Sequence, residues 1–214
     1  MQLKTSFFNR NAASVARELL GRVILHRYQN HWLAARIIET EAYYQNEKGS
    51  HASLGYTEKR RALFMPAGTI YMYYARGKDS FNVSCRGEGD AVLIKSAFPF
   101  ESITPAALKA MQRLNPTVSG EARPIEKLCA GQTLLCRALN LKVPDWDQQS
   151  FDSQRLFIDD TGYQPDEIVQ APRLGIPTGR DEHLMLRFID LAYAKYCTRN
   201  PLTQRNTNYR LFSP

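Results

Sequence analysis

The stretch from Arg36 to Lys95 constrains the fold most, because it opens on a strand that places two carboxylates and an aromatic ring on one face. Residues alternate between the two faces of a β-strand, so Glu39, Glu41 and Tyr43 lie together. Two carboxylates and a phenol are poor material for a hydrophobic core, since an unpaired buried carboxylate is costly. Taken alone, this pattern predicts an exposed strand edge.

The residues that follow favour a functional surface instead. His51 stands in a polar segment and is followed by a basic cluster, Lys59-Arg60-Arg61. Further on, Tyr71 and Tyr73 share one face of an aromatic strand. In isolation such a histidine is typical of a protein surface, and such an aromatic stripe of a core. A slot lined by rings is also what an extruded nucleobase needs, because these bases are held by stacking.

Composition indicates the kind of partner. The chain has 214 residues, of which 43% are hydrophobic, enough to bury a core as one domain. Its net charge of +7 favours a polyanionic partner such as nucleic acid, or an anionic membrane surface, although excess charge also aids solubility. The charge is uneven, since residues 191–214 contain four basic residues and no acidic one.

The cysteines and histidines indicate the compartment. The four cysteines lack C-x-x-C spacing and the four histidines are scattered, so neither a disulfide framework nor a metal site is predicted. The chain opens without a signal peptide and has no apolar run long enough to cross a bilayer. We therefore expect a soluble intracellular protein, cytoplasmic (nucleoid-associated) or nuclear, with no membrane association.

Helices are predicted at three places. Asn11 suits the N-cap position of a helix that ends near Gly21. Thr104 and Pro105 form a cap and first-turn pair for a helix through Leu114. Residues 125–139 have the pattern of one or two short helices broken near Gly131.

Strands are predicted on both sides of short turns. Arg22–Tyr28 and His31–Thr40 flank a turn at Gln29-Asn30, which sets Glu41 at the far end of the second strand. Residues that emerge from strands are common seats of chemistry. Gln45 to Ala62 reads as a polar loop. The other strand segments are 69–74, 80–85, 91–97, 156–158 and 168–169, with a tight basic turn at 75–79.

Several of these pieces, in this order, resemble the alkyladenine (3-methyladenine) DNA glycosylase family, monofunctional enzymes of base-excision repair. The matching pieces are Glu39-Thr40-Glu41-Ala42-Tyr43, His51, Pro66 to Tyr73, Phe81-Asn82-Val83, Asp90 to Leu93, Leu128 to Gly131, Leu135 to Leu139, Pro172 to Ile176 and Leu186-Arg187-Phe188. The resemblance implies an α+β fold: a single compact domain over residues 1–214, with a curved, mostly antiparallel sheet, surrounding helices and a DNA-inserting β-hairpin.

The resemblance also implies an activity. Such an enzyme flips alkylated or deaminated purines (3-methyladenine, 7-methylguanine, hypoxanthine and ethenoadenine are the class) out of double-stranded DNA and hydrolyses the N-glycosidic bond, which leaves an abasic site. The sugar passes through an oxocarbenium-like cation. One carboxylate can both take a proton from the attacking water and stabilise that cation. The resemblance gives this role to Glu41 and leaves Glu39 as a supporting residue.

Pocket roles follow from the same resemblance. Tyr43, His51 and Tyr73 would sandwich the flipped base, Tyr71 would support the pocket, and Asn82 would crowd the exocyclic amine of a normal guanine. The family needs no lysine nucleophile, metal or organic cofactor. No obligate protein partner is implied, and a monomer is expected.

Two positions depart from the family pattern. Lys95 stands where the family usually has an arginine that helps to hold the catalytic water, so the charge is kept without the planar multi-donor fork. Arg76 stands at the hairpin tip, where the family fills the gap left by the flipped nucleotide with a tyrosine. Beyond Ile189 the resemblance fades, and residues 190–198 have the appearance of an insertion. The expected DNA-binding residues are Arg76, Lys78, Lys59, Arg60 and Arg61.

Two other functions fit parts of the sequence. A non-catalytic nucleic-acid binding module would share the basic charge and the aromatic residues, but it has no need of a carboxylate such as Glu41 in the pocket. A small-molecule hydrolase with an exposed Glu39 and Glu41 pair would leave the basic C-terminal region unexplained.

Overall fold

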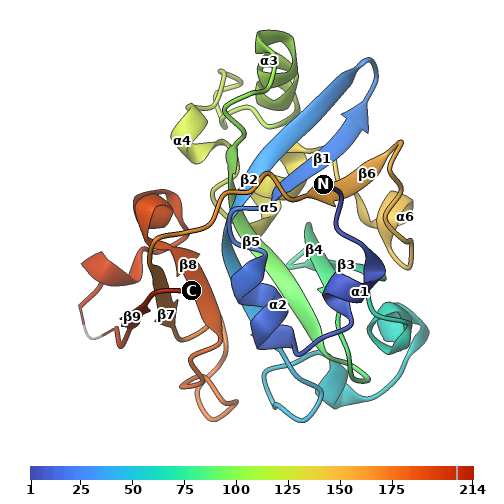
Figure 1. The fold of residues 1–214 in the computed structure, drawn as a ribbon, viewed down its shortest axis with the longest axis vertical. Helices are drawn as coiled ribbons and strands as arrows, with labels where there is room; N and C mark the ends of the chain where they lie inside the picture. Colours follow the sequence, from blue (N-terminus) through green and yellow to red (C-terminus); the bar gives the residue numbers. More distant parts are fainter. Residues whose placement is uncertain (206) are drawn as a thin grey trace.

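Strand β2 (His31–Tyr43) is the backbone of the fold in the computed structural model, which describes residues 1–205 and 207–214. Its first half pairs with β1 (Val23–Tyr28), its end pairs with β8 (Arg187–Asp190), and its other edge pairs with β5 (Ala91–Pro99) from Ala35 to Tyr43. β2 runs three residues beyond the predicted end at Thr40, so Glu41 and Tyr43 belong to the strand itself (Figure 1).

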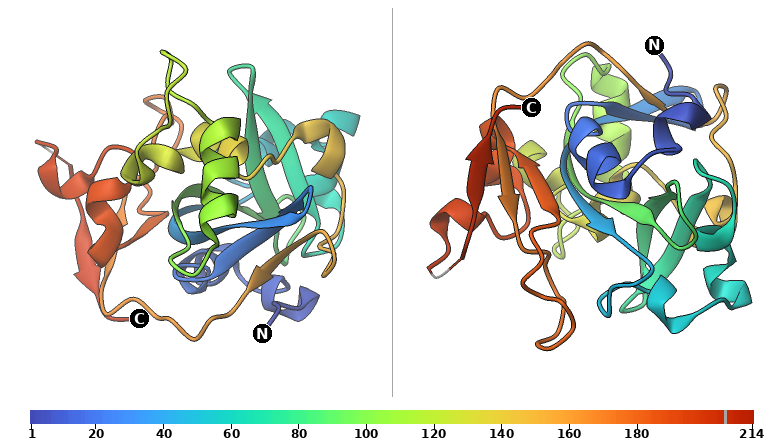
Figure 2. Two further views of the ribbon diagram at one scale, coloured as in Figure 1. Left: turned by 90° about the horizontal axis from the view of Figure 1, so that it is seen from above. Right: turned by 60° about the horizontal axis from the view of Figure 1, so that its bottom comes forward.

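All strand pairs among the described residues are antiparallel and form one nine-stranded sheet, which confirms the α+β prediction. Its main path runs β3-β4-β5-β2-β8-β7-β9; off this path, β1 pairs with β2, and β6 pairs with β1. The β3–β4 hairpin therefore lies on one side of β2 and β5, and strands β7 to β9 lie on the other (Figures 1 and 2). The remaining strands are β3 (Ile70–Ala75), β4 (Lys78–Ser84), β6 (Leu156–Asp159), β7 (Ile168–Ala171) and β9 (Arg210–Phe212).

The predicted helices form with the predicted caps. The side chain of Asn11 accepts hydrogen bonds from two backbone N–H groups at the start of α2, and Thr104 does the same for one at the start of α3. Gly131, at φ 104°, separates two short helices where one break was predicted. The helices are α1 (Thr5–Phe8), α2 (Ala12–Glu18), α3 (Pro105–Leu114), α4 (Ile125–Leu128), α5 (Gln132–Ala138) and α6 (Val143–Trp146).

The two faces of the sheet have opposite characters, and the register shows why. Ala42 of β2 stands level with Val92, Val83 and Ile70 of the next three strands, and all four are buried in the main hydrophobic core, into which α2 packs. The neighbouring row must face the other way, because the side-chain period of a strand is two. That row carries Glu41, Leu93, Asn82 and Tyr71. The polar face predicted for β2 thus continues across four strands.

A β-bulge interrupts the pairing of β2 with β5. Glu39 pairs with Ser96 and Thr40 with Ile94, which leaves Lys95 as the extra residue. Neighbours in a regular strand point to opposite faces, but a bulge lets two consecutive side chains oppose one partner strand. Lys95 consequently contacts Glu41 while Ser96 contacts Glu39.

The segment predicted as a loop at 45–62 is more ordered than expected. It contains a 3-10 helix at Ala52–Leu54 and a second at Glu58–Phe64. The guanidinium of Arg60 ties the two together by donating to the carbonyls of Leu54 and Gly55. Such short turns rest on local hydrogen bonds and need no long apolar period, so the sequence pattern gave no signal for them.

The cysteines are free and buried, and burial raises the pKa of every one of their thiols, to about 12 for Cys85. The other three are Cys129, Cys136 and Cys197. None of the helices in the described part of the chain has the length and apolar character needed to cross a bilayer.

Candidate active site

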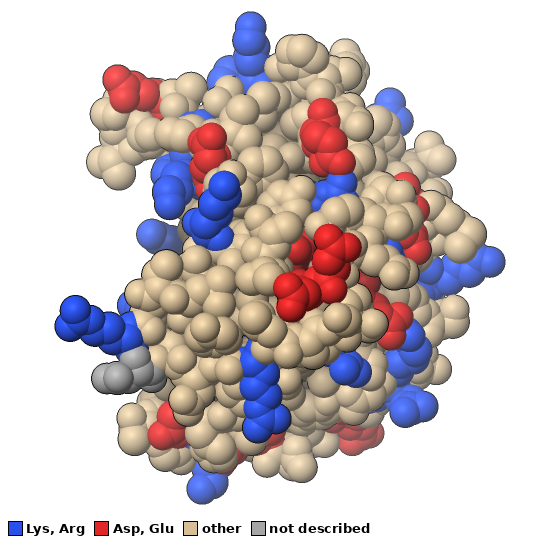
Figure 3. Space-filling view, turned by 60° about the vertical axis from the view of Figure 1, so that its left-hand side comes forward, with Lys and Arg blue, Asp and Glu red and all other residues tan. Residues whose placement is uncertain are grey.

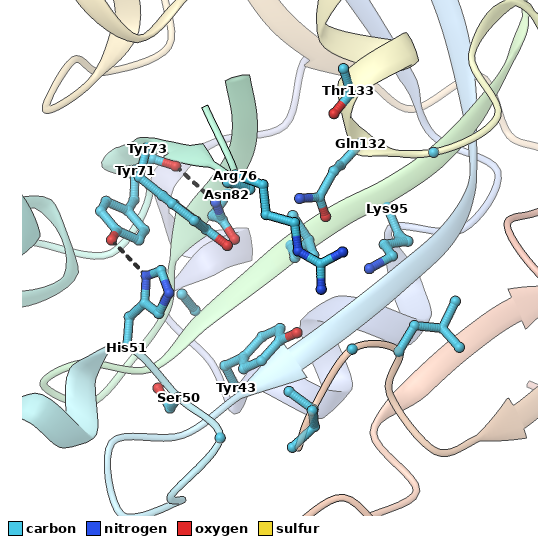
Figure 4. A pocket seen from close by; sticks show the side chains of 18 of the residues that line it. Tyr43, Ser50, His51, Tyr71, Tyr73, Arg76, Asn82, Lys95, Gln132 and Thr133 are labelled. Atoms are coloured by element: carbon cyan, nitrogen blue, oxygen red, sulfur yellow. Dashed lines mark hydrogen bonds between the residues drawn. The ribbon is translucent and has the colours of Figure 1, made fainter. Parts of the chain in front are cut away.

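A cavity of about 920 Å³ opens over the polar face of the sheet, within the range typical of ligand sites (Figure 4). Its floor comes from β2, β3, β4 and β5. Its sides come from the segment around His51, the start of α5, the loop after β7 and the residues Thr198 and Arg199. The predicted pocket residues Tyr43, Tyr71, Tyr73 and Asn82 all line this cavity, as does His51.

Aromatic rings from Tyr43, His51, Tyr71 and Tyr73 form much of its walls. His51 packs on Tyr73 with ring centroids 4.3 Å apart, and Tyr73 stacks on Tyr71 at 5.3 Å. The His51 ring also shares a hydrogen bond of 3.1 Å between Nδ1 and the hydroxyl of Tyr71 (Figure 4). Burial raises the pKa of the three tyrosines, so their phenols stay neutral. Partial desolvation, with Arg60 and Arg180 nearby, lowers the pKa of His51 below its usual 6.5.

Asn82 is fixed by its neighbours on the sheet. It stands opposite Tyr71 in the pairing of β3 and β4, and its Nδ2 donates to the backbone carbonyl of Tyr71 at 3.1 Å. A second, longer contact of 3.4 Å reaches the hydroxyl of Ser80. The amide is thus held in one orientation at the cavity wall, with 5% of the residue exposed.

Glu41 lies at the floor, directly behind residues that line the cavity. Its Oε2 accepts from the hydroxyl of Tyr43 at 2.7 Å, and its Oε1 accepts from the backbone N–H of Leu174 at 3.0 Å. The ammonium of Lys95 is 3.4 Å from Oε1 and 3.5 Å from Oε2. All three donor residues line the cavity. The carboxylate is therefore held in one orientation and lies one side chain away from the cavity space.

Arg173 and Leu174 are functional candidates that the sequence reasoning missed. The guanidinium of Arg173 lies 4.5 Å from the centre of the Tyr43 ring and pairs with Glu47 at 2.5 Å. The backbone N–H of Leu174 donates to Glu41. This segment therefore contacts both Tyr43 and Glu41 at the cavity floor. The Pro172 to Ile176 motif marked the segment, but its partners are more than 120 residues away along the chain.

Glu39 occupies a closed network two residues upstream. Its carboxylate accepts from Arg187 Nε at 2.6 Å, from the backbone N–H of Thr198 at 3.2 Å and from the hydroxyl of Ser96. Neither Glu39 nor Ser96 has any exposed surface, and 1% of Arg187 is exposed. Burial raises the pKa of Glu39, while Arg187 and Ser96 oppose this effect. These contacts fit the supporting role expected for Glu39.

The rim of the cavity is strongly basic. Its charged lining residues in the described part of the chain are all cations, namely Arg76, Lys78, Lys95, Arg180 and Arg199. Arg76 and Gly77 form the two-residue turn of the β3–β4 hairpin with φ of 51° and 75°, as a type I′ turn requires. A cavity lined by one sign of charge attracts polyanions. The face shown in Figure 3 differs, because Lys and Arg are interspersed there with Asp and Glu.

The predicted basic cluster at residues 59–61 does not join this rim. Arg60 is engaged with the backbone carbonyls of Leu54 and Gly55, and Arg61 lies 3.8 Å from Glu58. Lys59 is exposed and lies outside the cavity lining. The described residues contain no group of three His, Cys, Asp or Glu side chains that could hold a metal ion.

Comparison with known proteins identifies the family of the chain. Residues 6–193 match the family model described as "Methylpurine-DNA glycosylase (MPG)". A Pseudomonas aeruginosa (strain UCBPP-PA14) relative is 65% identical over 94% of this chain and 84% of its own length. A relative from Pseudomonas savastanoi is 63% identical over 94% of this chain and 91% of its own length, and one from Clostridium botulinum is 31% identical over 82% and 88%. Each is named "Putative 3-methyladenine DNA glycosylase". The chain belongs to the methylpurine-DNA glycosylase family, as the resemblance read from its motifs predicted.

Proposed function

We propose that this protein is a monofunctional DNA glycosylase that extrudes a damaged purine from double-stranded DNA and hydrolyses its N-glycosidic bond. Its substrates are alkylated or deaminated purines of the 3-methyladenine, 7-methylguanine, hypoxanthine and ethenoadenine class. The observation that carries this proposal is the Glu41 carboxylate at the floor of an aromatic cavity whose charged lining is entirely basic in the described residues. Basic rims suit a DNA backbone, and aromatic walls suit a base.

The aromatic residues bind the extruded base. Tyr43 lies on one side, while His51 and Tyr73, with ring centroids 4.3 Å apart, lie on the other. Stacking of this kind accepts many purines, so discrimination needs a polar group. Asn82, held by the Tyr71 carbonyl at 3.1 Å, is placed to crowd the exocyclic amine of a normal guanine.

Hydrolysis proceeds at the sugar with the aid of Glu41. The bond between C1′ and the base nitrogen breaks, and the base keeps the electron pair. Water adds its oxygen to C1′, and Glu41 takes the released proton. The carboxylate also stabilises the cationic sugar while the bond is breaking. Lys95, 3.4 Å from Glu41, helps to hold the water and the carboxylate in place.

The hairpin tip supplies the wedge. Arg76 stands at the two-residue turn between β3 and β4, and its exposed side chain reaches over the cavity (Figure 4). In proteins that bind the minor groove, inserted side chains separate neighbouring base pairs. The guanidinium of Arg76 can stack on the exposed base pair and pair with a flanking phosphate. Lys78 lies on the same rim and contacts the phosphate backbone of the DNA.

Base release is the direct test. Duplexes that contain hypoxanthine or methylated purines are incubated with the protein and then treated with alkali, which cuts the strand at abasic sites. We expect cuts at the damaged base after alkali and intact strands without it. Tight binding to these duplexes without any base release would instead support a non-catalytic binding module. Cleavage without alkali would overturn the monofunctional assignment.

A further inference from the structure

Thr198 and Arg199 form a wall of the cavity that lies beyond the segment shared with the family model, which ends at residue 193. The two residues come from the connection between a 3-10 helix (Leu191–Tyr196) and a second one (Pro201–Thr203). The family model ends before this point, so its match assigns them no role. Any role they have must be inferred from their own surroundings.

The backbone of this wall is fixed by buried charges. Nη2 of Arg187 donates to the carbonyl of Thr198 at 2.5 Å and to that of Arg199 at 3.2 Å. The N–H of Thr198 donates to Glu39, and its hydroxyl lies 3.3 Å from that of Ser96. Ser96 also accepts from the N–H of Gly131 at 3.0 Å, across the start of α5. The Glu39 network thus reaches the cavity lining at two places, Thr198–Arg199 and Gly131.

Arg199 itself adopts an unusual backbone conformation. Its φ of 48° places a residue with a large side chain in the left-handed region, which is uncommon outside glycine, asparagine and aspartate. Such conformations persist only where the surroundings impose them, and they cluster at functional sites. The two carbonyl contacts from Arg187 supply that constraint.

The Arg199 side chain is exposed and available. Among the described residues it makes no hydrogen bond or ion pair through its guanidinium, whereas Lys95 is paired with Glu41 and Arg180 with the carbonyl of Lys48. An exposed guanidinium at the rim matches a phosphate better than a base, because its fork binds two oxygens at once. The phosphodiester of a flipped nucleotide stays in the strand and therefore remains at the rim.

We propose that Arg199 binds a phosphate of the DNA strand next to the extruded nucleotide, and that the buried Glu39–Arg187 pair is the positioning device that holds it there. This inference rests on the proposed glycosylase function. It assigns Glu39 a task that differs from catalysis, and it makes residues 198–199 part of the DNA-binding surface.

The first experiment compares Arg199→Ala with Arg113→Ala, a matched loss of one exposed guanidinium on α3, outside the cavity lining. The probe is a duplex with a stable abasic-site analogue, titrated with salt. We expect Arg199→Ala to weaken binding about tenfold and to reduce the salt slope by about one, as the loss of one phosphate contact does. The Arg113→Ala variant should stay within about twofold of wild type, as expected for an exposed charge that makes no phosphate contact.

The second experiment tests positioning through a double-mutant cycle. Glu39→Gln should weaken binding in the wild-type background and have no further effect once Arg199 is alanine. If Glu39→Gln does not fold, Ser96→Ala takes its place, because it loses contacts to both Glu39 and Gly131. Losses that add in the double variant would show that the network acts on stability alone and would overturn the positioning role.

The two proposals fail in different ways. If the wild-type protein releases no damaged base, the glycosylase function is wrong. If it releases base but Arg199→Ala and Arg113→Ala bind alike, the glycosylase function stands and Arg199 is not the phosphate contact.

Discussion

Glu39 and Glu41 lie two residues apart on the same face of β2, and their surroundings are opposite in kind. Both carboxylates are fully buried. The side-chain donors to Glu39 are Arg187 and Ser96, and neither lines the cavity. The side-chain donors to Glu41 are Tyr43 and Lys95, and both line it. The side-chain partners of Glu39 are therefore separated from the cavity, whereas those of Glu41 border it.

The difference teaches that burial alone does not separate a structural carboxylate from the one that we propose to be catalytic. A buried ion pair with extra hydrogen bonds costs several kcal/mol to break, roughly 3–5, and this makes Glu39 a fixed point of the fold. The partners of Glu41 can exchange a hydrogen bond for one to water, because the cavity lies directly behind them. Each prediction below tests one side of this contrast.

Replacing the carboxyl group of Glu41 should have the largest effect on activity. Glu41→Gln keeps the shape but cannot accept a proton, so base release should fall by about 10²–10⁴-fold while binding to damaged DNA persists. Base release is measured under single-turnover conditions with a hypoxanthine-containing duplex. Binding is measured by titration with a duplex that contains an abasic-site analogue. Near-normal release by Glu41→Gln, together with an inactive Glu39→Gln, would move the catalytic role upstream.

The opposite ranking is expected for stability. Glu39→Ala leaves Arg187 buried without its partner and should lower the free energy of unfolding by about 3–5 kcal/mol. Glu41→Ala leaves Lys95 beside the cavity, where water can reach it, so the loss should be nearer 1–3 kcal/mol. Urea denaturation of the two variants provides the comparison. An equal loss of unfolding free energy in the two variants would show that water in the cavity does not solvate the unpaired Lys95.

The bulge offers a test with adjacent residues. Lys95→Ala should slow base release by roughly 10–100-fold, since a hydrogen bond to a charged group contributes about 1.5–3 kcal/mol. Lys95→Arg should recover much of this loss. Ser96→Ala, on the Glu39 side, should lower the free energy of unfolding more than Lys95→Ala does. A reversed order would mean that Lys95 serves the fold rather than the reaction.

Substitutions of Arg76 at the hairpin tip should have a smaller effect, on base flipping. Arg76→Ala should weaken base flipping about tenfold, because a stacked cation contributes about 1–2 kcal/mol, and should affect nonspecific binding less. Arg76→Tyr should restore flipping and make binding less dependent on salt. A fluorescent reporter base beside the lesion measures flipping in each variant. Normal flipping with uniformly weaker binding would make Arg76 a phosphate contact.

The smallest expected effect concerns pH. The pKa of His51 is lowered by desolvation and by two nearby arginines, so the folded protein resists its protonation. The unfolded chain takes up this proton first, near pH 6.5, and stability is therefore lost as the pH falls from 6.5 to the folded pKa. Proton NMR should give a midpoint below 6.5 for this ring, assigned by its absence in His51→Gln. A midpoint above 6.5 would contradict a partly desolvated His51.

Much of the cavity floor was predictable from the sequence, because alternation in β2 and the turn at residues 75–79 are local signals. The alignment of Glu41 with Asn82 and Tyr71 follows once the register is known, but the register itself depends on pairing across the sheet. The bulge at Lys95 is invisible locally, since it arises from a mismatch between two strands that pair far apart in the chain.

The different surroundings of Glu39 and Glu41 were the least predictable feature. The sequence places both on one face and favours Glu41 only through family resemblance. Their distinction depends on Arg187, Thr198 and Leu174, which are 133 or more residues away. The C-terminal segment had basic composition but no periodic pattern, so its 3-10 helix at Leu191–Tyr196 and its contact with the cavity needed the structure.

The four buried thiols have a consequence for a protein of this family. Electrophiles that methylate purines also attack sulfur, and the reactive form of cysteine is the thiolate. Because burial raises the pKa of each thiol, almost no thiolate forms at neutral pH, and the surrounding core blocks approach. The fold thereby keeps the thiols, its most nucleophilic side chains, in their unreactive protonated form and away from reagents of this kind.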